Sequence, residues 1–334
     1  AYVSALEIAC RMTLAATNRA NHPWLTTTLF GVLGAALAAG RVRSLPEATL
    51  RHAVGIAYSS AGGNRQGLLD GAMIQRLQPG LSAQAGVAAV ALASQGVTGA
   101  TEVLEGRYGL YPSYYGADYE PRNLLDGLGR EFRMLDLALK PYPCCSYSQE
   151  PIEAATELAH EPGFDAGAVK EVVVSVASRH AAGLVDRAYE PRSCAQVDAQ
   201  FSMQYVIAAT LVRGSLGLKD FQDDALHDRA VIDYARRVRV VVDEQAANTV
   251  TVTLQDGTQR SRRVKTARGH PSRAYGHAEL LGKLAECASF GAESTVPDAQ
   301  AIYDCVTRLE QLADIGELVR LIAPAPRRAA RAAR

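Results

Sequence analysis

The stretch Glu171-Val172-Val173-Val174-Ser175-Val176 decides the fold class, because a run this rich in β-branched residues is typical of a strand. Two later runs, residues 238–242 and 250–254, have the same character and predict two more strands. Asp256-Gly257 follows the last of these runs and predicts the tight turn of a β-hairpin, whose second strand covers residues 258–265. The sequence therefore predicts a small antiparallel sheet in this half of the chain.

Helical patterns lie between and around these strands. Residues 201–212 predict a helix that ends at Gly214, so that helices would pack on the sheet. Outside residues 140–268 the hydrophobic period is mainly helical. We therefore predict a mainly α protein in which an α+β lid domain, residues 140–268, is inserted into a discontinuous helical domain made of residues 1–139 and 269–334.

The predicted helices of the N-terminal region contain many small residues. Residues 2–17 and 26–39 show apolar positions at helical spacing. Gly31 and Gly34 lie in the second of these segments, where a bare surface would let a neighbouring helix approach closely. We expect an all-α domain with tight spacing between its helices.

Two start signals place further helices in this domain. Ser44-Leu45-Pro46-Glu47 has the pattern of a capping box with proline in the first turn, and predicts a helix through Tyr58. Pro79 predicts the start of another helix over residues 80–95, which Gly96 would close.

Charge and composition exclude several classes of protein. Lys plus Arg and Asp plus Glu are equal at 35 each, so the formal net charge is zero and the basic footprint of a nucleic-acid binder is missing. The longest apolar stretch, residues 29–40, is too short and too glycine-rich to cross a bilayer. No secretory signal opens the sequence. We expect a cytoplasmic protein that binds neither nucleic acid nor membrane.

The six cysteines give no sign of a metal site or of a disulfide framework. They form no CxxC pair and have no histidine at zinc-ligand spacing. Cys144 and Cys145 are adjacent, and with no basic partner close in sequence we interpret them as small buried residues rather than catalytic thiols. The sequence predicts neither a metal nor another cofactor.

Five stretches together resemble the MmgE/PrpD family of lyases, which includes 2-methylcitrate dehydratase and cis-aconitate decarboxylase. They occur in the family's order and span nearly the whole chain: Asn21-His22-Pro23; Gly62-Gly63-Asn64 with residues 70–80; Gly96-Val97-Thr98-Gly99 with Leu104-Glu105-Gly106; Lys140-Pro141-Tyr142-Pro143-Cys144-Cys145; and residues 199–205. The resemblance implies a helical domain with an α+β lid, a homodimer, and cofactor-free chemistry on small di- or tricarboxylates. Family members also have a longer N-terminal region. Because Ala1 enters a helical pattern at once, we expect the natural protein to begin earlier.

The implied reaction removes water or carbon dioxide next to a carboxylate, after abstraction of an α-proton. Such an elimination needs a base, donors that stabilise the enediolate, and cations that hold the remaining carboxylates. Two alternatives stay open. One is an epimerase of an imino- or amino-dicarboxylate, and the other is a diverged, non-catalytic member that binds a carboxylate.

His22 and Tyr205 are the predicted catalytic residues. His22 precedes Pro23 and a predicted helix, and an imidazole is the natural base near neutral pH. Tyr205 could donate to an oxyanion or protonate a leaving group, although a place in the core is an equally good interpretation. Ser202 lies three residues before Tyr205 on the same predicted helix face and is assigned to substrate binding. His180 and the other histidines are interpreted as structural or exposed.

Four further residues are predicted to bind substrate. Arg76 lies between glycines and could hold a carboxylate with its planar fork, although a surface ion pair is the alternative. Lys140 is predicted to lie near the junction of the two domains. Gln75 and Gln149 stand where the family usually has lysine and histidine, so both could keep a hydrogen bond without supplying a charge. The active site is therefore predicted between the helical domain and the lid.

Overall fold

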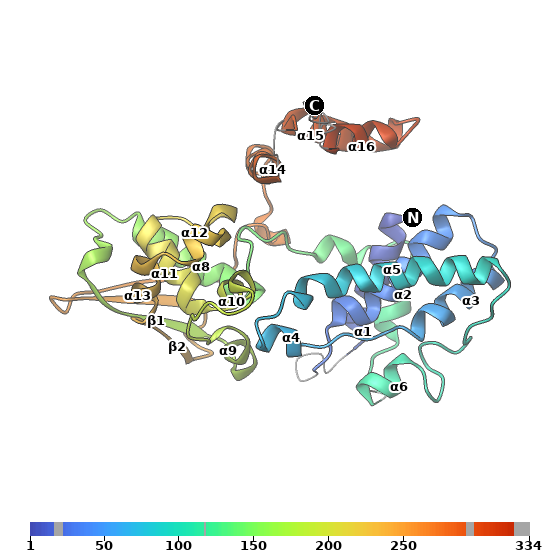
Figure 1. Cartoon of the computed structure of the whole chain (residues 1–334), viewed down its shortest axis with the longest axis horizontal. Helices are drawn as coiled ribbons and strands as arrows, with labels where there is room; N and C mark the ends of the chain where they lie inside the picture. The colour runs from blue at the N-terminus through green and yellow to red at the C-terminus, as the bar shows by residue number, and fades with distance from the viewer. Residues whose placement is uncertain (17–22, 117, 292–296, 324–334) are drawn as a thin grey trace, which may run out of the picture.

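The computed structural model describes residues 1–16, 23–116, 118–291 and 297–323. Its described part contains two hydrophobic cores that lie side by side along the long axis of the molecule (Figure 1). We call them the helical core, which draws its buried residues from positions 12–115, and the α/β core, which draws them from positions 144–264. The prediction of a mainly helical protein with a small sheet domain is confirmed.

The helical core is built mainly from four helices: α1 (Tyr2–Ala15), α2 (Thr26–Val42), α3 (Glu47–Tyr58) and α5 (Ile74–Ser94). Shorter elements complete it: α4 (Gln66–Leu69), α6 (Leu110–Tyr115), α7 (Arg122–Leu125) and η2 (Arg133–Asp136). A Cβ placed on Gly86 of α5 would lie 2.7 Å from the Val32 carbonyl oxygen of α2, so this glycine allows the two helices to touch. The close approach predicted at Gly34 is an ordinary contact at 3.6 Å with α1, and at Gly31 there is none.

Two of the predicted helix starts are wrong. Helix α5 begins at Ile74 and runs through Pro79, which lies in its second turn and gives up one backbone hydrogen bond of the helix. Ser44 takes a positive φ of 50° before α3, and its side chain does not cap that helix. Pro46 occupies the N-cap position of α3 instead.

The sheet of the α/β core has four strands in the order β2-β1-β3-β4, with bounds β1 (Val169–Val176), β2 (Val238–Val242), β3 (Thr249–Leu254) and β4 (Gln259–Arg263). The predicted hairpin is confirmed, with β3 and β4 antiparallel around Gly257 at a φ of 88°. The prediction of a purely antiparallel sheet is wrong, since β1 pairs with β2 in parallel, with Val172 opposite Val238. A long helical crossover between these two strands makes the parallel pairing possible.

Two helices, α8 (Gln149–Ala159) and α11 (Met203–Arg213), lie against each other and against the sheet. Val172 and Val174 of β1 and Val250 and Val252 of β3 are fully buried. The crossover also contains short helices: α9 (Arg179–Val185), α10 (Ala195–Gln200), η5 (Leu218–Phe221), α12 (Asp223–Leu226) and α13 (Arg229–Ala235). Helix α11 ends at Gly214, as predicted, in the left-handed conformation.

The C-terminal helices are α14 (His277–Gly291), α15 (Ala299–Thr307) and α16 (Gly316–Ile322). They lie apart from both cores in Figure 1, and α14 contacts η5 of the α/β core. One such contact is the hydrogen bond from the Leu218 N–H to Glu286 Oε1 at 3.1 Å. The predicted assignment of residues 269–334 to the helical domain, with residues 140–268 as a separate lid, stays a prediction.

Candidate functional site at the junction of the two cores

Two arginines of the α/β core hold the α4 segment of the helical core. Arg187 donates to the Leu68 carbonyl oxygen at 2.8 Å and to the Leu69 carbonyl oxygen at 2.7 Å. Arg192 donates to the same Leu69 oxygen at 3.1 Å and also pairs with Asp198. These bonds satisfy the carbonyl groups of a short helix that has few of its own partners, and they fix the junction at this point.

Gly71 explains why the chain can turn so close to this contact. Its φ of 64° lies in the left-handed region, and an added Cβ would lie 2.3 Å from Asp198 Oδ1. A side chain here would therefore push apart the two cores as well as strain the backbone.

Arg76 and Gln75 lie in the first turns of α5, beside α10 of the other core (Figure 1). Arg76 is exposed, and its Nη2 donates to Gln200 Oε1 at 2.7 Å. The Gln75 Oε1 is buried and has no hydrogen-bond partner within the described residues. The structure thus brings both predicted substrate-binding residues to the junction, with an exposed guanidinium on one and an unused acceptor on the other.

Gln149 holds a turn together rather than facing a ligand. Its Oε1 accepts from the Tyr142 N–H at 3.0 Å, and its Nε2 donates to the Cys145 carbonyl oxygen at 2.9 Å and to the Tyr142 carbonyl oxygen at 3.2 Å. The side chain is buried, with 5% of its surface exposed. The backbone of the turn occupies both ends of the Gln149 amide, and the predicted role of Gln149 in substrate binding stays a prediction.

Lys140 lies at the beginning of the same turn. Its Nζ donates to the Cys144 carbonyl oxygen at 3.0 Å, and the residue is exposed. The two cysteines are buried, as predicted. Burial raises the pKa of the Cys145 thiol, and the nearby Lys140 and Arg65 cations oppose that rise. A protonated buried thiol is unreactive, so neither cysteine is a nucleophile here.

Tyr205 does not face the junction. It is fully buried in the α/β core, where its hydroxyl donates to the Asp220 and Ala225 carbonyl oxygens at 2.5 Å and 3.2 Å. Ser202 is also buried, and it caps α11 by accepting from the Tyr205 N–H. The structure gives the Tyr205 hydroxyl a backbone partner in the core and makes Ser202 the N-cap of α11, while the catalytic role of Tyr205 and the substrate-binding role of Ser202 stay predictions.

His22 lies outside the described residues. The residue after it, Pro23, accepts a hydrogen bond from the Arg65 N–H at 3.1 Å, and Trp24 pairs with Asn64 as an isolated β-bridge. The described chain next to His22 is therefore joined to the segment that leads into α4.

Arg65 and His180 also belong to the junction, and the sequence reasoning missed them. Arg65 is the N-cap residue of α4, and His180 lies in the first turn of α9. The pKa of the His180 imidazole is lowered because partial burial disfavours its charged form and because the Arg65 cation is close. The one signal in the sequence is that Arg65 directly follows the family-like Gly62-Gly63-Asn64 motif.

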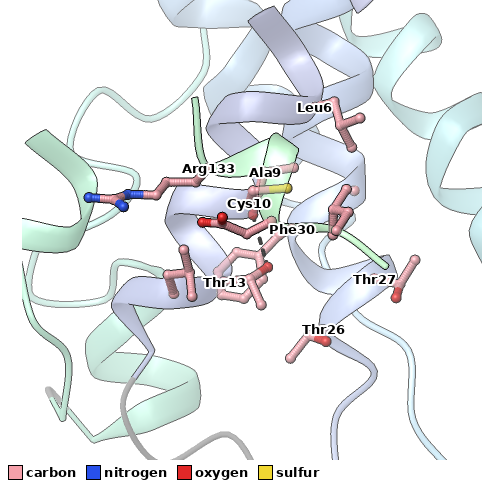
Figure 2. A pocket seen from close by; sticks show the side chains of 12 residues that line it. Leu6, Ala9, Cys10, Thr13, Thr26, Thr27, Phe30 and Arg133 are labelled. Atoms are coloured by element: carbon pink, nitrogen blue, oxygen red, sulfur yellow. Dashed lines mark hydrogen bonds between the residues drawn. The ribbon is translucent and has the colours of Figure 1, made fainter. Parts of the chain in front are cut away.

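A separate cavity of about 510 Å³ lies within the helical core, between α1, α2 and η2. Figure 2 shows its labelled lining residues, Phe30, Cys10 and three threonines among them, with the Arg133 guanidinium extending away to one side. The walls are mostly apolar, and Arg133 is paired with Glu131 at 3.0 Å. This cavity does not have the cations that a polycarboxylate requires.

No group of three or more histidine, cysteine or acidic side chains suited to a metal ion occurs in the described ranges. No helix in the part of the chain that the structure describes is long and apolar enough to cross a membrane.

Comparison with known proteins identifies the family. The model of the MmgE/PrpD N-terminal domain matches residues 1–122, and the model of the MmgE/PrpD C-terminal domain matches residues 142–310. The chain therefore belongs to the MmgE/PrpD family, as its motifs predicted.

Several cis-aconitate decarboxylases are similar to this chain. The enzyme of Aspergillus terreus is 26% identical over 325 residues, and the alignment covers 90% of this chain and 65% of the fungal one. The enzyme of Mus musculus is 25% identical over 317 residues, covering 90% and 62% of the two chains. The enzyme of Homo sapiens is 24% identical, covering 91% and 63%. The chain thus spans less than two thirds of the length of these relatives.

Proposed function

We propose that this chain provides the carboxylate-binding part of a lyase, which removes water or carbon dioxide from a small di- or tricarboxylate without a cofactor. The observation that supports this best is the exposed Arg76 guanidinium at the junction, which donates to Gln200 of the α/β core and pairs with no carboxylate among the described residues. Cations without neighbouring carboxylates suit an anionic substrate. Family membership and the names of the relatives agree with this choice.

In the proposed reaction a base takes the proton from the carbon next to a carboxylate, and the electron pair moves into an enediolate. In a dehydratase the pair then returns to expel the β-hydroxyl, which leaves as water after protonation. In a decarboxylase the first step is different, because no α-proton is removed: the C–C bond to one carboxylate breaks, carbon dioxide leaves, and the electron pair of that bond stays on carbon, which takes up a proton from an acid. His22 remains the proposed base, and Arg76 and Lys140 are the proposed carboxylate ligands.

The second candidate function is that of a non-catalytic protein that binds a carboxylate. Gln149 favours it, because its amide is committed to the Tyr142–Cys145 turn where the family usually has a histidine. Gln75 favours it as well, since an amide supplies neither a proton nor a charge. An epimerase would share the first step, the loss of the α-proton.

Proton exchange in deuterated water, followed by NMR with a panel of di- and tricarboxylates, separates the three possibilities. Elimination products support the lyase, exchange without net conversion supports an epimerase, and binding without exchange supports the non-catalytic protein. In the lyase, His22→Gln should lower kcat by roughly 10²–10⁴, the usual loss for a general base. Arg76→Ala should act mainly on substrate affinity, by about 1.5–3 kcal/mol.

We also propose that the protein works as a homodimer in the cytoplasm. Exposed apolar side chains on α5, which include Leu77, Leu81, Val87 and Leu92, support a self-association surface. Sedimentation at micromolar concentration tests the dimer, and a clean monomer of the full-length protein would contradict it.

A further inference from the structure

We propose that Gln200 is a positioning residue, whose side chain and backbone hold Arg76 and Lys140 in one site for a ligand with at least two carboxylate groups. The inference rests on the proposed function, in which these two cations bind carboxylates. It deepens that function, because it joins the two cations into a single site and names the residue that joins them.

A continuous series of three hydrogen bonds connects the two cations. Arg76 Nη2 donates to Gln200 Oε1 at 2.7 Å. The Gln200 carbonyl oxygen accepts from the Cys145 N–H at 3.0 Å. The peptide group that contains this N–H also contains the Cys144 carbonyl oxygen, which accepts from Lys140 Nζ at 3.0 Å. One residue and one peptide group therefore link a cation of α5 to a cation of the turn before α8.

Gln200 is itself fixed at the end of α10. In the same helix Asp198 is buried, and its carboxylate accepts from the Arg192 N–H at 2.9 Å and from Arg192 Nε at 3.0 Å. Arg192 also donates to the Leu69 carbonyl oxygen, in the segment that leads into α5. Helix α10 thus holds the backbone before Arg76 through one residue and the Arg76 side chain through another.

The residue type at position 200 determines how much charge Arg76 keeps for a ligand. The amide oxygen of Gln200 accepts one hydrogen bond from the guanidinium and adds no negative charge. No other hydrogen bond or ion pair of the Arg76 guanidinium occurs within the described residues. Its remaining N–H groups are therefore available to a carboxylate, which a guanidinium binds with two parallel hydrogen bonds.

Lys140 meets the same condition. Its Nζ donates to a backbone carbonyl oxygen, a neutral acceptor, and it forms no ion pair in the ranges that the structure describes. Both Lys140 and Arg76 are exposed, so a ligand can reach them. A monocarboxylate can neutralise only one of the two cations, whereas a di- or tricarboxylate can neutralise both. We therefore expect the site to select for the number of carboxylate groups.

The test measures, by calorimetry on the whole chain, the binding of tricarballylate, a tricarboxylate, and of butyrate, a monocarboxylate. Tricarballylate should bind more tightly. Gln200→Glu should weaken tricarballylate binding roughly 10- to 100-fold, because the new carboxylate neutralises Arg76 and takes up its donors. Gln200→Met keeps the length of the side chain but loses the amide acceptor, and should weaken binding by a smaller factor.

A double-mutant cycle separates positioning from a general effect on the fold. In an Arg76→Gln background, Gln200→Met should not weaken tricarballylate binding further, because the guanidinium that it positions is gone. Arg76→Gln and Lys140→Gln should each reduce the preference for tricarballylate over butyrate, since each removes one of the two cations. As a matched control, Gln255→Glu adds the same charge to an exposed glutamine of the β3–β4 turn and should change neither affinity.

The outcomes distinguish this inference from the proposed function. If Arg76→Gln weakens tricarballylate binding and neither Gln200 variant does, Gln200 is not a positioning residue and the lyase proposal stands. An equal effect of Gln200→Met with and without Arg76 also overturns the positioning role. If Lys140→Gln leaves the preference for tricarballylate unchanged, the two cations do not share one ligand.

Turnover gives the remaining distinction. Coupling between Gln200 and Arg76 without turnover of any carboxylate supports the inference and contradicts the lyase. Binding of tricarballylate that is absent, or no tighter than that of butyrate, overturns the inference.

Discussion

The inner face of α1 contains a fully buried arginine, and the junction of the two cores contains a half-buried one. The two arginines differ in the hydrogen-bond partners of their guanidinium groups. Arg11 is 1% exposed, and its guanidinium pairs with Glu7 at 2.5 Å. It also donates to the carbonyl oxygens of Asp126 and Glu131 at 2.8 Å and 2.7 Å. Arg65 is half-buried at the junction, and no such partners occur for it within the described residues.

The difference separates an arginine whose donors are used by the fold from one whose guanidinium makes no hydrogen bond or ion pair with the described residues. The Arg11 donors join α1 to the loop between α7 and η2. Hydrogen bonds from Met134 and Arg11 outweigh burial and hold the pKa of Glu7 below its ordinary value, so the pair is ionised. A buried guanidinium with filled donors has nothing left for a substrate, whereas unused donors at a junction are available.

The largest effect should come from breaking the filled network. Arg11→Met removes one partner of a buried ion pair and leaves the Glu7 carboxylate uncompensated. The free energy of unfolding should fall by about 3–5 kcal/mol in urea denaturation. The exposed Arg122→Met should stay within about 0.5 kcal/mol of the unaltered protein. Equal behaviour of the two variants would mean that burial of Arg11 contributes little to the fold.

Helix α5 allows a sharper test of the packing on which the helical core depends. A Cβ on Gly86 would lie 2.6 Å from the Ala35 Cβ and 2.8 Å from the Ala36 nitrogen, whereas a Cβ on Gly80 would meet nothing within 4 Å. Gly86→Ala should therefore destabilise the protein by about 1–3 kcal/mol through overpacking. Gly80→Ala should stabilise it by about 0.5–1 kcal/mol, because alanine favours the helix. Thermal or urea unfolding would reveal the opposite signs.

The smallest effect concerns two buried tyrosines of the α/β core. Tyr205→Phe removes a hydroxyl that donates to Asp220 and should cost about 0.5–1.5 kcal/mol of stability. Tyr234→Phe should cost less, because the Tyr234 hydroxyl is buried with no hydrogen-bond partner within the described residues. If Tyr205→Phe abolished turnover while unfolding normally, the structural role given to Tyr205 would be wrong.

Much of the fold could be predicted from short patterns in the sequence. The β-branched run around Val174 gave a strand, Asp256-Gly257 gave a hairpin, and Gly214 ended a helix, because each signal acts through local backbone preference. The parallel pairing of β1 with β2 could not be predicted in this way. The pairing depends on the side of β1 at which the chain re-enters the sheet after the long crossover. Local backbone preferences do not determine that position.

The candidate site was harder to predict, since motifs identify residues without showing what their side chains touch. Arg76 lies at the junction, where it donates to Gln200, and Lys140 donates to the Cys144 carbonyl oxygen of its own turn, while their roles in substrate binding stay predictions. Tyr205 and Gln149 belong to equally family-like motifs, yet one is fixed in the core and the other in a turn. A buried polar side chain forms hydrogen bonds with the backbone groups that lie next to it in the fold. The spacing of residues in the sequence does not show which groups these are.

By itself the sequence determined the mainly helical fold class, the strands and their hairpin, and the family, because these follow from local periodicity and from motifs in order. Only the tertiary structure decided which charged side chains are already paired. The sequence places Glu7 four residues before Arg11 and so offers one partner for it, but the sequence does not show that Arg11 is buried or that distant carbonyl groups accept from its other donors. Carbonyl groups more than 100 positions away accept hydrogen bonds from Arg11, and only long-range packing brings them there.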